Sequence, residues 1–228
     1  MAEMLNKRQI LKTIYDIYDQ LSKNWQLACK KSCLDCCTDH VLITGLEGVV
    51  ILDYLKNQNL NGFLKNIQTI LPDKRYHPKT TINQEAWLTV NDKPIPEPEE
   101  APAHPCPFLT NRQCAVYPVR PMTCRTMVSS IPCNQTGQAS MTSFQMSAAT
   151  LFYQFIEMLD SDGYYGNYLN ILEMLTTSDT QSIQIVLSKS SLLKNQRISH
   201  VMIPPEHQKE LIPIMNAIQH SFRSINLA

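Results

Sequence analysis

Residues 29–37 read CKKSCLDCC and hold four of the chain's eight cysteines, the last two of them adjacent. Cysteine thiolates bind zinc and the iron of iron-sulfur clusters, and the two-residue gap between Cys33 and Cys36 is a spacing that both kinds of site use. A second segment carries the other four cysteines. This density predicts a site that binds zinc or iron, the iron in one case as an iron-sulfur cluster. The predicted ligands are Cys29, Cys33, Cys36, Cys37, Cys106, Cys114, Cys124 and Cys133.

Other uses of these cysteines remain open at the level of sequence. Cys29, Cys33 and Cys36 stand at i, i+4 and i+7, so they could form the apolar stripe of a helix. The even number of cysteines is compatible with disulfides. The second segment lacks the repeated CxxC of a zinc ribbon, and no strand in a βαβ pattern precedes the first CxxC, which disfavours a thioredoxin-like site.

The adjacent pair, Cys36 and Cys37, raises a separate question. Consecutive side chains point to opposite faces of a strand and diverge by about 100° on a helix, so two such thiols seldom reach one tetrahedral ion. We therefore expect them to serve different metal centres, or different parts of one polynuclear cluster. The alternatives are a single four-cysteine site beside a buried, apolar Cys37, or a disulfide.

Composition narrows the classes of partner. Twenty Lys and Arg balance twenty Asp and Glu, so no net charge attracts the chain to nucleic acid or to an acidic membrane. No run approaches the roughly 18 apolar residues of a membrane span, and the N-terminal residues lack the apolar core of a secretory signal. We expect a cytoplasmic protein without a nucleic-acid or membrane partner. Thiols stay reduced in that compartment, which favours metal over disulfides.

Apolar residues recur at intervals of three and four on both sides of the cysteines, as in amphipathic helices. Thr44 and Glu47 form the pattern of a capping box at the start of one helix. A last helix follows Pro204 and Pro205 and continues to Phe222. The other expected helices cover residues 11–28, 46–54, 60–70, 144–159 and 168–175.

Non-helical structure is expected between these helices. Residues 72–105 include PIPEPEEAPAHP, whose prolines predict a loop or extended arm. Residues 106–125, CPFLTNRQCAVYPVRPMTCR, predict two short extended pieces around a TNRQ turn. The expected fold is mainly α: a helical shell around an irregular cysteine-rich centre, with at most a short β-hairpin. We expect one domain, 1–228, in which a C-terminal helical region of about 140–228 packs on a cysteine-cluster region of about 29–133.

Together these motifs resemble a known family. The order C-x3-C-x2-CC, the following TGLEGVV, then CPFL, CAVYPVRPMTCR and a final Cys133 are similar to the YkgJ-type cysteine-cluster family, whose CxxCxxCC domain is described as zinc- or iron-chelating. The resemblance covers about residues 29–133 and implies metal chelation without implying a reaction. Cys29 departs from it, because three residues separate Cys29 from Cys33 where the family name has two. A related branch includes the flagellin lysine methylase FliB, whose cysteine cluster is thought to hold iron-sulfur.

Basic residues and histidines near the thiols are candidate contacts. Arg120 and Arg125 flank Cys124, and buried metal thiolates require donors and counter-charge around their sulfurs. The alternative for each arginine is an exposed side chain or one paired with a carboxylate, and we weigh this alternative nearly equally for Arg120 and lower for Arg125. His40 and His104 lie close to cysteines but stay outside the first set of ligands.

Three functional classes follow, in decreasing order of support. The first is a metal-binding protein whose site is structural or serves storage, delivery or sensing. The second is an iron-sulfur enzyme that modifies protein lysines, as the FliB branch implies, although no cofactor fingerprint such as GxGxxG occurs in the chain. The third is a helical module with a structural metal and a protein partner.

Overall fold

The computed structural model describes residues 2–30, 33–60, 62–63, 75–189 and 191–223. The helices of this part are α1 (Ala2–Ser22), α2 (Gly45–Asn57), α4 (Ile82–Val90), α5 (Met122–Thr126), α6 (Cys133–Thr136), α7 (Ser143–Leu159), α8 (Tyr168–Thr176), α9 (Thr180–Lys189) and α10 (Gln208–Phe222). Short 3-10 turns cover Tyr117–Val119 and Pro205–His207. The strands are β1 (Leu42–Thr44), β2 (Leu109–Thr110), β3 (Gln113–Cys114), β4 (Tyr164–Asn167) and β5 (Leu193–Lys194).

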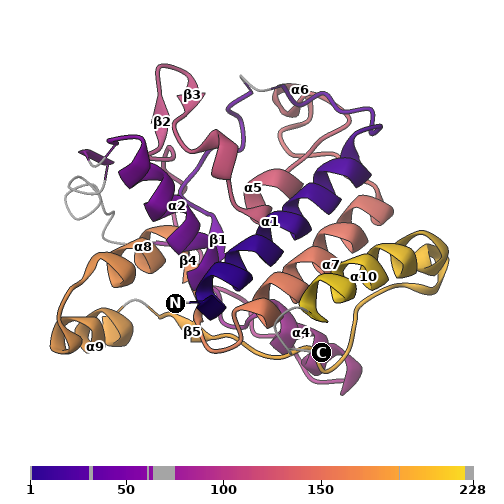
Figure 1. Ribbon diagram of the computed structural model, residues 1–228. Coiled ribbons are helices and arrows are strands. Elements are labelled where there is room, and N and C mark those ends of the chain that lie inside the picture. Colours follow the sequence, from indigo (N-terminus) through magenta and orange to yellow (C-terminus); the bar gives the residue numbers. More distant parts are fainter. Residues whose placement is uncertain (1, 31–32, 61, 64–74, 190, 224–228) are drawn as a thin grey trace.

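Helices α1, α7 and α10 lie side by side and enclose the first apolar core (Figure 1). Ile10, Leu11, Ile14 and Tyr18 recur on one face of α1 and are buried there. Phe152 of α7 is fully buried against the same core. Burying an aliphatic or aromatic side chain of this size contributes about 1.5–3 kcal/mol, so this face fixes α1 against α7.

A second core lies around a small antiparallel sheet of strand order β1-β4-β5. Helix α2 follows β1 directly, and α8 follows β4, so both helices are positioned by paired strands. Thr44 caps α2 by accepting from the backbone N–H of Glu47, while the Glu47 carboxylate accepts from the backbone N–H of Thr44. This capping box confirms the one predicted from the sequence.

The mainly α fold and the short hairpin are confirmed. Strands β2 and β3 pair antiparallel on either side of Asn111 and Arg112. Both turn residues have positive φ, 49° and 60°, as a tight two-residue hairpin turn requires. The expected helices of residues 144–159 and 168–175 correspond to α7 and α8, and the last expected helix to α10.

Two expectations were wrong, and one cannot be assessed. Helix α1 ends at Ser22 and not near Cys29, because the chain turns at Trp25 and the backbone N–H of Ala28 donates to Ser129 instead of continuing the helix. The stretch 72–105 is not all loop: Thr81 caps α4 by accepting from the N–H of Gln84. The expected helix of residues 60–70 falls mostly outside the described residues. Helix α9 and the β1-β4-β5 sheet were not predicted.

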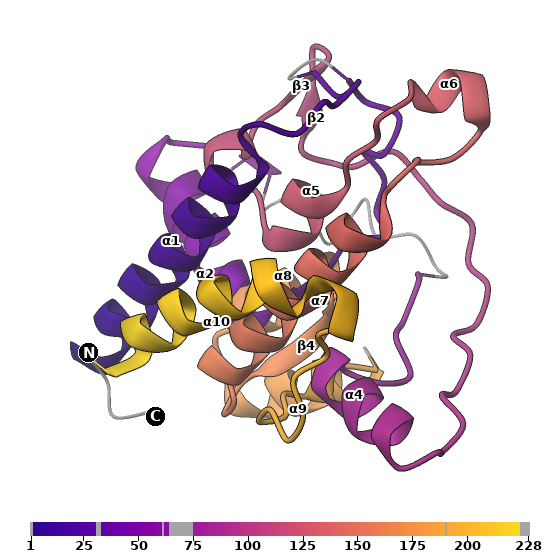
Figure 2. The same ribbon diagram turned by 90° about the vertical axis from the view of Figure 1, so that its right-hand side faces the viewer.

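The C-terminal half contacts the cysteine-bearing half through several elements. Helix α7 packs on α1 and α5, and α8 packs on α2 and β1. Figure 2 shows α7 and α10 beneath the end of the molecule where the cysteine-bearing segments lie. These contacts support the expectation of one domain, which stays a prediction. No helix in the described part of the chain is both long and apolar enough to cross a membrane.

Candidate metal centre

The eight cysteines come from two segments of the chain and from different kinds of structure. Those of the first segment lie in the irregular stretch between α1 and β1, so they do not form a helix stripe. Cys114 belongs to β3, Cys124 to α5, and Cys133 begins α6, while Cys106 precedes the β2-β3 hairpin. All eight are described, each is partly exposed, and none of them forms a disulfide.

The two segments converge on one cavity of about 250 Å³. Seven of the eight cysteines line it: Cys29, Cys33, Cys36, Cys37, Cys106, Cys114 and Cys124. The eighth, Cys133, lines two adjoining cavities together with Cys29 and Cys33. The fold therefore gathers around one space thiols that are up to about a hundred residues apart in the chain.

A short antiparallel pairing joins the two segments at the adjacent cysteines. Thr38 forms a β-bridge with Pro105, and the N–H of Cys106 donates to the carbonyl of Cys37 at 3.0 Å. The buried Asp39 carboxylate accepts from the backbone N–H of His104 at 2.8 Å and contacts His104 Nδ1 at 3.0 Å. These contacts hold Cys37 beside Cys106.

A second link positions Cys29. The N–H of Ala28 donates to the carbonyl of Ser129 at 2.8 Å, and the N–H of Ser129 donates to Cys29 Sγ at 3.2 Å. The Ser129 hydroxyl in turn accepts from the backbone N–H of Ser140 and donates to the Ile131 carbonyl. Cys29 is thereby fixed next to the segment that leads to Cys133.

The electrostatic neighbours of the thiols divide them into two groups of four. The pKa of Cys29 is raised by burial first and then by Cys33, Cys36 and Cys133, against a lowering hydrogen bond from Ser129. We call these four the loop group: Cys29, Cys33, Cys36 and Cys133. The pKa of Cys37 is lowered by a hydrogen bond from Cys36, against burial and the other three thiols around it. We call these the core group: Cys37, Cys106, Cys114 and Cys124.

The adjacent cysteines are the point where the two groups meet. The Cys36 thiol donates to the Cys37 sulfur, and this bond is the first cause of a raised pKa at Cys36, ahead of burial. Cys36 is among the thiols that raise the pKa of Cys29, whereas Cys106, Cys114 and Cys124 are those that raise the pKa of Cys37. Of the two, Cys36 lines the neighbouring cavity that Cys29, Cys33 and Cys133 also line. Separate duties for the pair stay a prediction. Cys36 also raises the pKa of Cys124, after burial, Cys106 and Cys114, so the groups are in electrostatic contact.

The core group is packed against apolar side chains and receives hydrogen bonds. Cys106, Cys114 and Cys124 pack against the second apolar core. The Tyr168 hydroxyl lies 3.5 Å from Cys106 Sγ. Burial raises the pKa of Cys106 and of Cys114, while backbone N–H groups two residues along the chain, those of Phe108 and Val116, donate to the two sulfurs and lower it. Such donors stabilise thiolate ligands.

The two arginines differ in their relation to the thiols. The Arg120 guanidinium lies over the Tyr117 ring, 4.1 Å from its centroid, and lowers the pKa of Cys114, although burial raises that pKa more. Arg125 instead pairs with Asp19, its Nη1 lying 2.7 Å from Oδ2. The carboxylate pairing that we weighed lower for Arg125 is the one observed. Arg120 is therefore the better placed of the two to supply counter-charge.

The histidines engage other groups through one ring nitrogen each. His40 Nε2 lies 3.2 Å from the carbonyl oxygen of Pro102, and His104 Nδ1 contacts Asp39. Both stay outside the set of proposed ligands. Sequence reasoning did not identify Asp39, Ser129 or Tyr168, because their contacts with the thiol segments join residues 62 or more positions apart in sequence, which no local pattern reports.

The thiols fit zinc or iron chemically, yet they are not arranged as a finished site. Four thiolates are a common ligand set for both metals. Among the described residues, no three His, Cys, Asp or Glu side chains form a group that could hold an ion as they stand.

One comparison with known proteins matches this centre. A family model described as "CxxCxxCC: Putative zinc- or iron-chelating domain" matches residues 28–148, more than half of the chain. The chain belongs to this family. The match includes all eight cysteines and confirms the resemblance drawn from the sequence. No curated protein and no solved structure matches the chain.

Proposed function

We propose that the protein binds zinc or iron through all eight cysteine thiolates, as two four-thiol centres or as one polynuclear cluster with two halves. One observation carries the proposal: seven thiols from two distant segments line one cavity of about 250 Å³. Membership of a family described as zinc- or iron-chelating supports the metal. The loop group and the core group supply four ligands each, joined through Cys36 and Cys37.

The ligand set indicates what such a metal would do. A catalytic zinc site usually keeps one position open for water or substrate, whereas four thiolates fill a tetrahedral ion. Eight thiols for two centres leave no open position, which supports a structural, storage, delivery or sensing role over hydrolysis. Arg120 beside Cys114 would offset part of the negative charge of a four-thiolate centre.

Metal analysis of anaerobically purified, full-length protein tests this proposal. Elemental analysis should find about two zinc ions per chain, or iron with acid-labile sulfide and visible absorption if the centre is iron-sulfur. Reduced protein reconstituted with either metal and then desalted should retain the same amount. Protein that retains neither zinc nor iron after reconstitution would overturn the proposal.

A specific observation also favours a protein partner. Residues 93–100 have no regular secondary structure and are exposed throughout, with the side chain of Ile95 45% exposed. Proline-rich chain is extended in advance, so a partner can bind it at a low entropic cost. A photo-crosslinking residue at Ile95 should capture a distinct partner in cells, whereas the same residue at Ile185, which is also exposed, should not capture it. Identical products from both positions would contradict this.

A further inference from the structure

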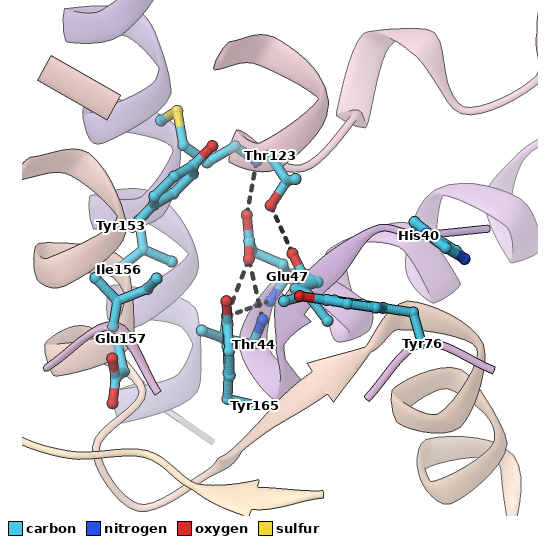
Figure 3. Close-up of a pocket in the computed structure, with 12 residues that line it drawn as sticks. His40, Thr44, Glu47, Tyr76, Thr123, Tyr153, Ile156, Glu157 and Tyr165 are labelled. Atoms are coloured by element: carbon cyan, nitrogen blue, oxygen red, sulfur yellow. Dashed lines mark hydrogen bonds between the residues drawn. The ribbon is translucent and has the colours of Figure 1, made fainter. Parts of the chain in front are cut away.

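A second cavity, of about 310 Å³, lies between α2, α7 and β4. Figure 3 shows Tyr153, Ile156 and Glu157 of α7 along one side, Thr44 and Glu47 in the middle, and Tyr76 and His40 on the far side. No cysteine lines it. Its volume is at the lower end of the range of small-molecule pockets, so it would take a small ligand.

Two buried carboxylates line this cavity. Glu47 is 4% exposed and accepts from the Tyr15 hydroxyl at 2.9 Å and from the backbone N–H of Met122 at 2.8 Å, besides its bonds within the capping box. Glu157 is 1% exposed and accepts from two backbone N–H groups, those of Asn83 at 2.8 Å and Gln196 at 2.7 Å. These donors lower the pKa of both carboxyl groups, but burial is the larger cause and raises the pKa of Glu47 and of Glu157 above the usual range.

Neither carboxylate has a cationic partner in the described part of the chain. The ion pairs found there involve other acidic residues. Glu47 lies in the first turn of α2, and Glu157 meets the first turn of α4, so helix dipoles offset part of their charge. Two buried carboxyl groups without a cationic partner nevertheless line one cavity, and a cation bound there would favour their ionised form.

Tyr165 supplies a further polar group to the cavity. Its side chain lines the cavity and is 8% exposed, and no hydrogen bond of its hydroxyl is found among the described residues. The hydroxyl oxygen is not fully enclosed, so it is able to meet water or a ligand in the cavity. Tyr76 and Tyr153 also line the cavity, and aromatic rings attract cations through their faces.

We propose that this cavity binds a small aliphatic ammonium ion. The carboxylates of Glu47 and Glu157 would attract the cation, the Tyr165 hydroxyl would accept an N–H from it, and the tyrosine rings would contact its charge and its methylene groups. This site is separate from the thiol centre, although the two are neighbours. Tyr153 also lines a cavity that Cys29, Cys33, Cys36 and Cys133 line, and Thr123 precedes Cys124 in the chain.

Calorimetric titration of metal-loaded, full-length protein with three probes tests the proposal. The probes are putrescine, which carries two ammonium groups, n-butylamine, which carries one, and n-butanol, a neutral control of similar shape. Both amines should bind more tightly than n-butanol, and putrescine should bind most tightly because it meets two carboxylates. Equal binding of n-butanol and n-butylamine would overturn the proposal. No binding at millimolar concentration would mean that the cavity holds only water, and would overturn it too.

Substitution at β4 locates the site, because Tyr164 and Tyr165 are adjacent and point to opposite faces of the strand. Tyr165→Phe should weaken amine binding about threefold or more, because it removes one hydrogen bond, while its melting temperature without amine should be equal or higher. Tyr164→Phe, the matched control, should bind amine as the wild type does. Unchanged binding by Tyr165→Phe would overturn the proposal.

Metal content separates this inference from the proposed function. Tyr165→Phe should retain the full complement of metal while amine binding is weakened, since the cavity contains no thiol. If the amine does not bind, the proposed thiol centre is unaffected. If the thiols bind no metal, the same titration still measures amine binding to the metal-free protein.

Discussion

The cysteine side chains of the core group and those of the loop group lie in different surroundings. Cys106, Cys114 and Cys124 pack against the apolar core around β1, α2 and α8. Backbone N–H groups donate to the sulfurs of Cys106 and Cys114, and the Tyr168 hydroxyl also reaches Cys106. Within the described part of the chain, the cysteines of the loop group belong to neither apolar core, and three of the four lie in irregular chain. We therefore expect folding to position the core group before metal binds, and the loop group to depend on metal for its final arrangement.

The largest effect is expected when the C-terminal half is separated from the core group, because the two pack against each other. Tyr168 of α8 contacts Cys106, and α7 packs on α5, which carries Cys124. A fragment of residues 140–228 should therefore not fold cooperatively, because its apolar faces lose their partners. Circular dichroism and thermal unfolding of this fragment check the expectation. A soluble fragment with a cooperative transition would show an independent domain and would contradict the single domain that we predict.

Metal removal should have the next largest effect. Metal binding to a site absent from the unfolded chain adds to the folding free energy, which amounts to about 10 kcal/mol or more for a zinc-finger peptide and should amount to several here. Chelation under reducing conditions should lower the melting temperature. Hydrogen exchange should increase more around residues 28–36 than around 106–124. An unchanged melting temperature for reduced, metal-free protein would show that the thiols bind no metal of structural consequence.

Paired substitutions in the metal-free, reduced protein sharpen the comparison. Cys124 packs in the apolar core, so Cys124→Ser places a hydroxyl there and should reduce the free energy of unfolding by about 1–3 kcal/mol. Cys133 has no such packing, and Cys133→Ser should change the same quantity by less than about 0.5 kcal/mol. Urea unfolding measures both. Equal losses would mean that the two groups do not differ in packing.

The smallest expected effect comes from one hydrogen bond. Tyr168→Phe removes the hydroxyl beside Cys106 and should cost about 0.5–1.5 kcal/mol of unfolding free energy, with a further loss of metal affinity in the core group. Tyr164→Phe is the control, because the Tyr164 ring contacts Lys194 and lines no cysteine cavity. A competition titration with a chelator compares the metal affinities. Equal metal affinities in the two variants would show that the Tyr168 hydroxyl does not contribute to metal binding.

Sequence alone predicted most of the helices and all of the thiol segments, because those signals are local. Helical periodicity placed α7, α8 and α10, and a threonine and glutamate three residues apart placed the start of α2. The strands β1, β4 and β5 have two to four residues each, too few for an alternating pattern to be recognised. The pairing of β1 with β4 also depends on contacts between residues more than a hundred positions apart, as between Leu42 and Asn167.

The sequence predicted the members of the candidate centre, which stay a prediction, but it could not indicate their arrangement. Because consecutive side chains diverge, the sequence predicted that Cys36 and Cys37 would bind different metal centres or different parts of one cluster. It could not indicate which other thiols would lie near each of them. The grouping depends on backbone contacts between segments, those of Cys37 with Cys106 and of Ala28 with Ser129. The carboxylate partner of Arg125 could not be predicted for a similar reason, since Asp19 lies on α1, far from it in sequence.

The central claim is that eight thiols form two groups that meet at Cys36 and Cys37, and metal content of Cys36→Ser and Cys37→Ser tests it most directly. Both proteins should be purified anaerobically beside the wild type and analysed for metal per chain. Each variant should lose about half of the bound metal if the groups are separate centres, and more if they share one cluster. Full metal content in Cys37→Ser would contradict the account, because Cys36 would then be the metal ligand of the pair and Cys37 only a packing residue.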